Sequence, residues 1–526
     1  MAKKEQNFTH IPKEKFSFVH DGDRIHDKKF DDKPIGYFKD AWNRFRKSKA
    51  SVVAAIIIIC IVLYAFVAPL VIDRDATFMC GTYAKKPPRV SWLADYGIMN
   101  GGNSQNPSEA GYIKMLAIGV GAENGDGMGA TLEEGLNSDY QPVIETGTSY
   151  VQELPGNKTA TYFPCTVDSY LHVGFLYTSM EQAEYQNIVA WQEETGIQVL
   201  YPLIEENEWN PDATDANNWY KAKVKGGMPV NINASGKGVQ VSYSPDMVLE
   251  DNYKRDGSGN VVYSTYTGGG DFDTAQLKIR VLYYNYYQYL YGCEPNYLLG
   301  TDSQGYDLAL RIAGGIKLSL LIAISVSVLN FVLGAAYGAV EGYYGGWIDI
   351  ILCRITDILS GVPFIIVATL FQIHLAKKVG AIPCLIFAYI LTGWIGTASR
   401  VRTQFYRFKN QEYVMAARTL GARDRRIIWK HIFPNTLGTI ITSSALVIPS
   451  TILSESMLSF LGIIKLGNAE GTSLGTLLAD ARAIWTTYPH LMLYPAIVIS
   501  LLMICFNLFG NGLRDAFNPA LRGVED

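Results

Sequence analysis

The side chains of this 526-residue chain whose types and spacing indicate a specific task lie in one basic segment, 412–434. Tyr413, Ala416, Ala417 and Leu420 stand at positions i, i+3, i+4 and i+7, so they share one face of a predicted helix. Two alanines on this face would let the backbone of another protein come close, as a helix seated in a partner's groove requires. The chemistry that this pattern predicts is docking rather than catalysis.

The same segment carries signals for a break between two helices. Gly421 is expected to end the first helix, and Asp424 can cap a second helix that runs to Pro434. An ordinary loop on the cytoplasmic side of a membrane would be basic as well. The spacing alone leaves both interpretations open.

The sequence gives little support for catalysis or nucleotide binding by this chain. No G-x-x-x-x-G-K-[ST] run occurs, so the chain is not expected to bind ATP in the P-loop manner. The predicted membrane spans contain no H-E-x-x-H, no G-x-S-x-G and no carboxylate pair, which argues against an intramembrane enzyme. A net charge of −4 with 18% charged residues argues against a nucleic-acid-binding protein. We expect no catalytic, cofactor or metal site on this chain.

The elements that must position the basic segment are membrane helices. Residues 50–72 form an apolar run long enough to cross a bilayer, and the long polar segment before it argues against a cleavable signal peptide. Five further spans are predicted at 310–340, 350–375, 381–400, 435–463 and 490–511. The predicted fold class is a polytopic α-helical membrane protein with six transmembrane helices and an inserted α+β extracytoplasmic domain.

The distribution of charge predicts how these spans are oriented. Lys and Arg crowd the N-terminal side of the first span, so the N-terminal tail, 1–49, is expected in the cytoplasm. The loop 400–434 holds nine Lys or Arg against two acidic residues, which independently places it there too. Six crossings return the C-terminal tail, 512–526, to the same side. A short amphipathic helix at 35–45 would lie on the membrane surface.

The region between the first two spans, 73–305, is expected outside the cell membrane. Within it, about 104–290 has the glycine and asparagine clusters and short alternating runs of an α+β domain. Met180–Glu194 has the pattern of an amphipathic helix. The role of the inserted domain can be to dock another protein, to guard the outer mouth, or neither.

Three cysteines fall on the outer side: Cys80, Cys165 and Cys293. At most one disulfide can form among them, and the spacing does not choose the pair.

Three glycines at four-residue intervals lie near the end of the second span. Gly334, Gly338 and Gly342 form a small-xxx-small pattern, which allows two membrane helices to approach closely. Glycine is also simply common in membrane helices, but the regular spacing favours a packing role.

Ionisable residues inside a span are costly and normally face the bundle interior with a partner. Arg354 and Asp357, three residues apart, can pair with each other and are expected to have a structural role. Glu455 has no obvious local partner, so it can be a structural residue or part of a pathway or gate.

Several motifs in the C-terminal part belong together: Leu299–Asp307, Gly342–Asp349, Arg354–Leu359, Glu412–Gly421, His431–Asn435, Ile452–Gly462, Leu478–Arg482 and Asn507–Asp515. Through these motifs the chain, from about 296 to 523, resembles the permease subunits of dipeptide and oligopeptide ABC importers. The match is with the second of their two related permeases. It covers somewhat under half of the chain, and the outer domain is an insertion where most relatives have a short loop.

The resemblance implies a permease core, 306–511, of the type I importer kind in the cell membrane. It implies pairing with a second homologous permease, with two P-loop ATPases that bind ATP and Mg, and with an extracytoplasmic peptide-binding lipoprotein. The implied coupling residues are Glu412, Tyr413, Ala416, Ala417, Leu420, Gly421, Ala422 and Asp424. The implied motif of the outer mouth comprises Gly300, Thr301, Asp302, Gly305 and Asp307.

The sequence departs from this family at two positions, with Met415 where an acidic residue is usual and Tyr306 where an arginine is usual. Two other functions stay open. One is a membrane-anchored receptor or adhesion protein whose outer domain does the work, and the other is an importer of nickel or another small solute. A receptor has no reason to keep a helix–glycine–helix loop between two spans, so peptide import is the favoured function.

Overall fold

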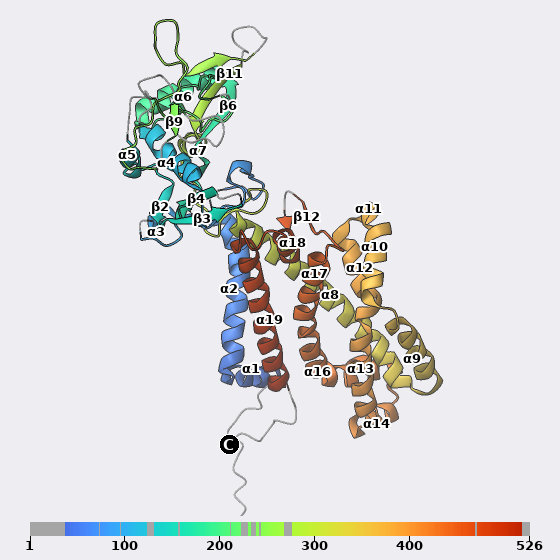
Figure 1. Cartoon of the computed structure of the whole chain (residues 1–526). Coiled ribbons are helices and arrows are strands. Elements are labelled where there is room, and N and C mark those ends of the chain that lie inside the picture. The colour runs from blue at the N-terminus through green and yellow to red at the C-terminus, as the bar shows by residue number, and fades with distance from the viewer. Residues whose placement is uncertain are drawn as a thin grey trace, which may run out of the picture.

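The structure, a computed structural model, has a bundle of long helices and a smaller inserted domain at one end of it (Figure 1). It describes residues 37–72, 74–94, 96–123, 131–155, 158–210, 212–221, 230–232, 238–240, 243–267, 276–468 and 471–517. Among these residues, five helices are long and apolar enough to cross a membrane, and a bent pair can add a sixth. The predicted fold class is therefore confirmed, while most of the N-terminal tail and the last nine residues, 518–526, lie outside the described residues.

The bundle begins with α1 (Tyr37–Lys47), which coincides with the predicted amphipathic helix, and with α2 (Lys49–Val71). α2 packs along α19 (His490–Phe517), so the first and last spans lie side by side (Figure 1). The other helices are α8 (Leu308–Tyr344), α9 (Gly346–Ser360), α10 (Phe364–His374), α11 (Ala376–Val379), α12 (Ala381–Gly393), α13 (Ile395–Phe408), α14 (Glu412–Thr419), α15 (Asp424–Arg426), α16 (Phe433–Ala445), α17 (Val447–Phe460) and α18 (Leu474–Ala481). A short hairpin, β12 (Gly467–Asn468) and β13 (Gly471–Thr472), precedes α18.

The third predicted span, 350–375, is not one straight helix. α9 and α10 meet at an angle of 71° across a break of three residues. Pro363 lies at this break, and a proline disfavours the helical conformation of the residue before it. The apolar pattern alone could not distinguish this bent pair from a single crossing.

The described residues of the inserted domain include a three-stranded and a four-stranded antiparallel sheet. β1 (Gly102–Gln105), β5 (Cys165–Asp168) and β2 (Val143–Thr146) form one, in this order. In the other, β11 (Gln276–Leu282) pairs with β6 (Phe175–Glu181), β10 (Ser264–Tyr266) and β7 (Leu200–Tyr201). The remaining elements are α3 (Ser91–Ala94), α4 (Glu109–Glu123), α5 (Leu132–Leu136), the hairpin β3 (Tyr150–Leu154) and β4 (Lys158–Tyr162), α6 (Gln182–Thr195), the hairpin β8 (Val230–Ile232) and β9 (Gly238–Gln240), and α7 (Tyr283–Tyr291).

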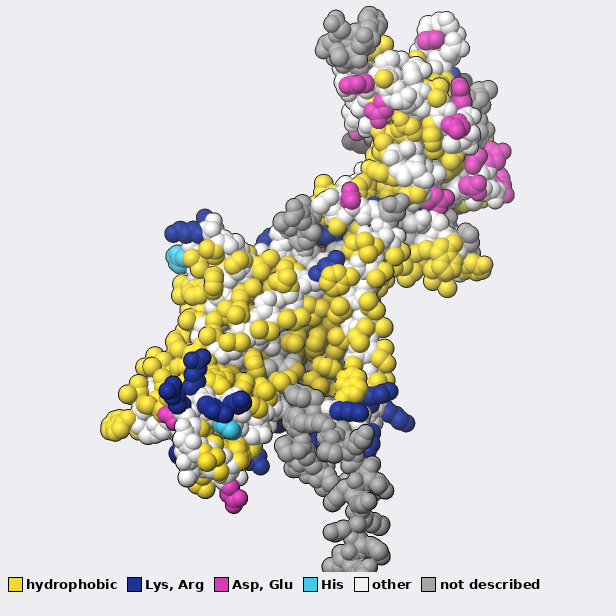
Figure 2. Space-filling view, turned by 180° about the vertical axis from the view of Figure 1, so that it is seen from behind, with side chains coloured by type: hydrophobic (Ala, Val, Ile, Leu, Met, Phe, Trp, Pro, Cys, Tyr) yellow, Lys and Arg dark blue, Asp and Glu magenta, His cyan; other side chains and the backbone are white. Residues whose placement is uncertain are grey.

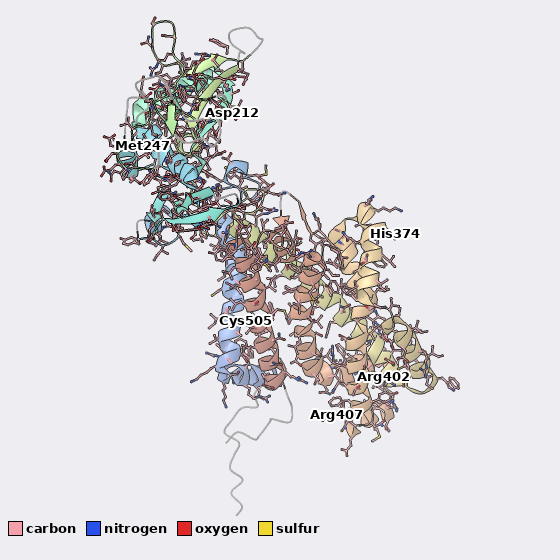
Figure 3. The ribbon with its side chains drawn as sticks, viewed as in Figure 1. Asp212, Met247, His374, Arg402, Arg407 and Cys505 are labelled. Atoms are coloured by element: carbon pink, nitrogen blue, oxygen red, sulfur yellow. The ribbon has the colours of Figure 1, made fainter. Side chains whose placement is uncertain are left out.

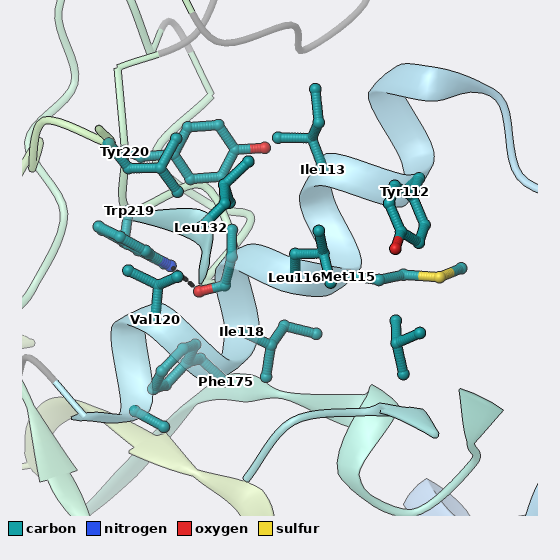
Figure 4. Packing of buried hydrophobic residues seen from close by; sticks show 14 of the residues in the cluster. Tyr112, Ile113, Met115, Leu116, Ile118, Val120, Leu132, Phe175, Trp219 and Tyr220 are labelled. Carbon is teal, nitrogen blue, oxygen red and sulfur yellow. Dashed lines mark hydrogen bonds between the residues drawn. The ribbon is translucent and has the colours of Figure 1, made fainter. Parts of the chain in front are cut away.

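The core of this domain surrounds α4, a helix that sequence analysis missed. Ile113, Leu116 and Val120 are buried on it, and Trp219 donates from Nε1 to the Ala117 carbonyl oxygen at 3.0 Å (Figure 4). The predicted helix 180–194 is observed as α6, on which Ile188 is fully buried. All seven cysteines are free, so none of the three cysteines that were predicted on the outer side forms a disulfide in this structure.

Candidate functional site

α14 lies at the end of the helix bundle that is farthest from the inserted domain (Figure 1). One side of it faces the chain itself: Val414 is fully buried and Ala417 is nearly so. Val414 belongs to an apolar cluster with Tyr343, Phe405 and Ile427. The cluster fixes this short helix to the ends of α8 and α13.

The other side of α14 is open to solvent. Leu420 is 88% exposed, Met415 is 52% exposed and Tyr413 is 39% exposed. Ala416 is exposed as well, and so is Glu412. The prediction that Ala417 shares this outward face is therefore wrong, because a short helix also needs a buried position on its own chain, and Ala417 with Val414 provides it.

Gly421 ends α14 with φ +81°, a conformation that favours glycine. Its N–H donates to the Arg418 carbonyl at 3.0 Å, and the N–H of Ala422 donates to the Ala417 carbonyl at 3.1 Å. This pair of bonds is a Schellman motif, which satisfies the last carbonyls of the helix. Gly421 thus stops α14 and turns the chain back toward α15.

Asp424 does not cap the following helix, so that prediction is wrong. It is the first residue of α15 rather than the residue before it, and the N-cap, Arg423, makes no side-chain cap. The Asp424 carboxylate instead accepts a hydrogen bond from the Tyr343 hydroxyl at 2.6 Å. The side chain ties the turn after α14 to the end of α8.

The helix that begins at Asp424 does not stop at Pro434. It passes through a π-helical turn, η4 (Ile427–Ile432), into α16, and the stretch Asp424–Phe460 qualifies as one membrane-spanning helix. A proline ring clashes with the carbonyl four residues earlier in a regular α-helix, and the wider π turn relieves that clash. α13 likewise extends to Phe408, so the exposed loop is shorter than the predicted 400–434.

The three spaced glycines of α8 lie where α13 crosses it. A side chain at Gly334 would lie 2.8 Å from the Trp394 carbonyl oxygen, and one at Gly342 would lie 2.8 Å from the Arg402 carbonyl oxygen. At Gly338 it would overlap the carbonyl of Ala398. The backbones of the two helices are therefore in direct contact along this seam.

An ionic network that sequence analysis missed lies beside the seam. Arg402 donates two hydrogen bonds to the Asp349 carboxylate, at 2.6 and 2.7 Å, and Tyr406 donates a third at 2.7 Å. Glu341, buried on α8, lies 3.5 Å from Arg402. These contacts hold α9 against α8 and α13, the helices that carry α14.

The intramembrane ionisable residues divide into two cases. Arg354 and Asp357 do pair, at 3.2 Å, but both side chains are largely exposed on this chain, so the expectation that they face the interior is wrong here. Glu455 is buried and accepts hydrogen bonds from the hydroxyls of Ser319, at 3.0 Å, and Ser459, at 3.1 Å. Its partners come partly from α8, which no local pattern could indicate.

The motif predicted for the outer mouth forms a buried joint between chain segments. Thr301 is fully buried and exchanges hydrogen bonds with Lys86, and Gly300 and Gly305 pack against backbone of residues 80–87. Asp302 lies 3.4 Å from Arg311.

Asp307 caps α8 by accepting from the Ala309 N–H at 2.9 Å, and it pairs with Arg74 at 3.1 Å. Burial raises the pKa of its carboxyl, although Arg74 and the cap hydrogen bonds act in the opposite direction. A little farther on, Arg89 and Tyr297 exchange both backbone hydrogen bonds, at 3.0 and 2.8 Å. The insertion leaves and rejoins the rest of the chain at this pair.

An open cavity of about 800 Å³ lies between α13, α16 and α19. Three arginines contribute to its lining, Arg400, Arg407 and Arg514. The other polar residues that line it are Ser399, Thr403, Gln404, Asn435, Thr439, Thr442, Ser443 and Ser450. Figure 3 shows Arg407 at the same end of the bundle as α14. Among the described residues no group of three or more His, Cys, Asp or Glu side chains could hold a metal ion.

Two family models match this chain. Residues 331–523 match the model described as binding-protein-dependent transport system inner membrane component. Residues 36–88 match the N-terminal TM domain of oligopeptide transport permease C. Neither matched range includes the inserted domain.

Individual relatives agree with these matches. The oligopeptide transport system permease protein OppC of Bacillus subtilis is 40% identical over 223 residues, which cover 42% of this chain and 72% of that protein. The dipeptide transport system permease protein DppC of the same organism is 40% identical, with 42% and 68% covered. OppC of Haemophilus influenzae is 42% identical, with 43% and 71% covered.

Proposed function

This chain belongs to the family of inner-membrane components of binding-protein-dependent transport systems, and on that premise we propose that it is a permease subunit through which an ABC importer takes up oligopeptides or dipeptides. The chain supplies a path and a mechanical link, and ATP hydrolysis takes place on other subunits. The names of the similar proteins support peptides as the cargo.

The partners that we propose follow from this assignment. A second homologous permease forms the other wall of the path. Two P-loop ATPases bind ATP and Mg in the cytoplasm, and an extracytoplasmic lipoprotein delivers the peptide. The motion of the ATPases reaches this chain through α14.

The observation that carries the proposal is the geometry of α14. Leu420 is 88% exposed at the end of a short helix, next to the small exposed side chain of Ala416. The opposite face is fixed to α8 and α13 by Val414, and Gly421 stops the helix. A helix with one rigidly held side and one open apolar side supports docking into a cleft of another protein. The receptor alternative gives no reason for such a helix at the end opposite the outer domain.

The arginine-lined cavity supports a cargo that carries carboxylates. Among the described residues, Arg400, Arg407 and Arg514 form no ion pair, so their charge is available to the cavity. Guanidinium groups attract carboxylates and repel metal cations. The cavity therefore favours peptides over nickel as the cargo.

A bulky side chain on the open face of α14 tests the assignment. Ala416→Trp should abolish peptide uptake and co-purification of the ATPases, because the new ring would fill the space that a docked partner needs. Asn43→Trp is the matched control, because this residue is exposed on α1 at the same end of the molecule (Figure 1). Full uptake and normal ATPase recovery in Ala416→Trp would contradict the proposal.

The cargo is tested separately with the cavity arginines. In the double variant Arg400→Gln, Arg407→Gln, uptake of an acidic peptide should fall relative to uptake of a neutral peptide of the same length. Because the binding protein is the same in both assays, a change in this ratio comes from the permease. An unchanged ratio would refute a role of the cavity arginines in cargo selection. Energised uptake of nickel without uptake of peptide would overturn the peptide assignment but not the importer.

A further inference from the structure

A short apolar projection lies at the base of the inserted domain, and its described residues are those of α3 and 96–98. Trp92 is 70% exposed, Tyr96 is 78% exposed and Ile98 is 58% exposed. Figure 2 shows hydrophobic side chains gathered on a projection below the domain, level with the outer end of the helix bundle. Large apolar side chains that stand together in this way mark an interaction surface.

The projection has a fixed shape. The N–H of Val90 donates to the Met99 carbonyl at 2.9 Å, and the N–H of Ile98 donates to the Leu93 carbonyl at 3.2 Å. These bonds close the segment on itself, with Gly97 at φ +73° in the turn. Little conformational entropy remains to be lost when its side chains bind, which favours binding.

A chain of hydrogen bonds fixes the height of the projection relative to the membrane helices. The N–H of Ser91 donates to the side chain of Asn296 at 2.8 Å, and Arg74 donates to the Asn296 carbonyl at 2.8 Å. Arg74 follows closely after the last residue of α2, Val71. α3 therefore lies within a few residues' reach of the point where the first span ends.

That point is the boundary between hydrocarbon and headgroups. α2 has 23 residues. At 1.5 Å per residue it is about 34 Å long, just enough for a hydrocarbon core of about 30 Å. Leu70 and Val71, its last residues, are 83% and 73% exposed, as lipid-facing residues are in an isolated chain. The apolar surface of α2 and that of the projection thus meet the same layer.

The residue types fit this layer. Tryptophan and tyrosine concentrate at membrane–water interfaces, where the ring lies among the headgroups and its polar atom reaches water. Only one residue between 91 and 99, Asp95, is charged in the sequence. If the projection bound another protein instead, it would have no need to lie level with the end of a membrane span.

We propose that Trp92, Tyr96 and Ile98 insert into the outer interface of the bilayer and give the inserted domain a second attachment to the membrane beside α2. The inference is independent of the cargo and requires only that α2 spans the membrane.

The test uses the full chain in lipid nanodiscs, with a bimane fluorophore attached through Tyr96→Cys. The exposed native cysteines are removed by Cys60→Ala and Cys293→Ala, and the partly exposed one by Cys353→Ala. A nitroxide on the lipid headgroup should quench this probe severalfold more than a probe attached through Asp212→Cys. Asp212 lies on the inserted domain far from the helix bundle (Figure 3).

Aqueous iodide reports the opposite exposure and should quench the probe at position 212 more strongly. Adding Trp92→Ser and Ile98→Ser should reduce the lipid quenching at position 96 while the melting temperature of the protein stays unchanged. Stronger quenching by iodide than by lipid at position 96 would overturn the proposal. Protection from both quenchers would overturn it too, because it would show that protein covers the projection.

Discussion

Gly421 is a single residue on which the transmission of motion is expected to depend. Its φ of +81° is costly for residues with a side chain, by about 1–2 kcal/mol, and asparagine tolerates it best. We predict that Gly421→Val unwinds the Schellman turn and uncouples ATP hydrolysis from uptake. The measurement is the number of ATP molecules hydrolysed per peptide transported by the complete complex in proteoliposomes.

Gly421→Asn is the control for this variant. Space is not the limit at this position, since a β-carbon there would have no atom within 4 Å. Asparagine should therefore keep coupling near normal, and only the strained valine should lose it. Equal coupling in both variants would refute a role for the left-handed turn.

Glu455 is predicted to stabilise the bundle rather than to gate it. Its two carboxylate oxygens each accept a serine hydroxyl, so Glu455→Gln leaves one hydroxyl of the pair, on Ser319 or Ser459, without an acceptor. An unsatisfied buried group costs about 1–3 kcal/mol. The thermal unfolding midpoint in detergent should fall, and Ser319→Ala should lower it as well, because it removes a donor from the buried carboxylate. Normal stability with altered transport would instead favour a gating role.

At the scale of elements, the seam between α8 and α13 makes a sharp prediction. Gly338→Ala should destabilise the protein strongly, because the added methyl group overlaps the Ala398 carbonyl. Gly314→Ala, in the same helix, meets no atom within 4 Å and removes a glycine from a helix interior, so it should be neutral or stabilising by about 0.5–1 kcal/mol. Thermal unfolding of the two purified variants compares them directly, and equal melting temperatures would argue against close packing at the seam.

The sequence predicted elements well where one physical signal dominates. The length of apolar runs located five of the six spans, and the basic loop with its glycine located α14. Prediction from the sequence failed where a contact with a distant segment determines the local structure. Which face of α14 is buried depends on the cluster that Val414 forms with α8 and α13, and the partners of Glu455 come partly from α8. The bend at Pro363 and the π turn before Pro434 depend on local strain that hydrophobicity does not report.

At the scale of the whole molecule, the arrangement predicts how the chain lies in the membrane. The inserted domain and α14 occupy opposite ends of the bundle (Figure 1), and Lys and Arg gather mainly at the α14 end (Figure 2). We predict that a membrane-impermeant maleimide labels Asp212→Cys in intact cells and labels Asn43→Cys only after permeabilisation. The background lacks the exposed cysteines Cys60 and Cys293. The reverse pattern would invert the proposed orientation.

The order of the strands in the inserted domain could not be predicted from the sequence. β11 lies between β6 and β10, and its partner strand β6 is about a hundred residues away in the chain. Short strands of three to seven residues carry too little pattern to specify such distant pairing. The α+β class could be predicted from composition, while the topology depends on packing around α4.

The backbone pair between Arg89 and Tyr297 has a consequence for how such chains evolve. The chain enters the inserted domain at Arg89 and leaves it at Tyr297. These two residues are neighbours in space. The family match at the N-terminal side ends at residue 88, immediately before this pair. A gene could therefore acquire, exchange or lose the whole insert by recombination at one place, and a tight turn could join the two ends without displacing a helix. The inserted domain can diversify freely while the helix bundle stays the same.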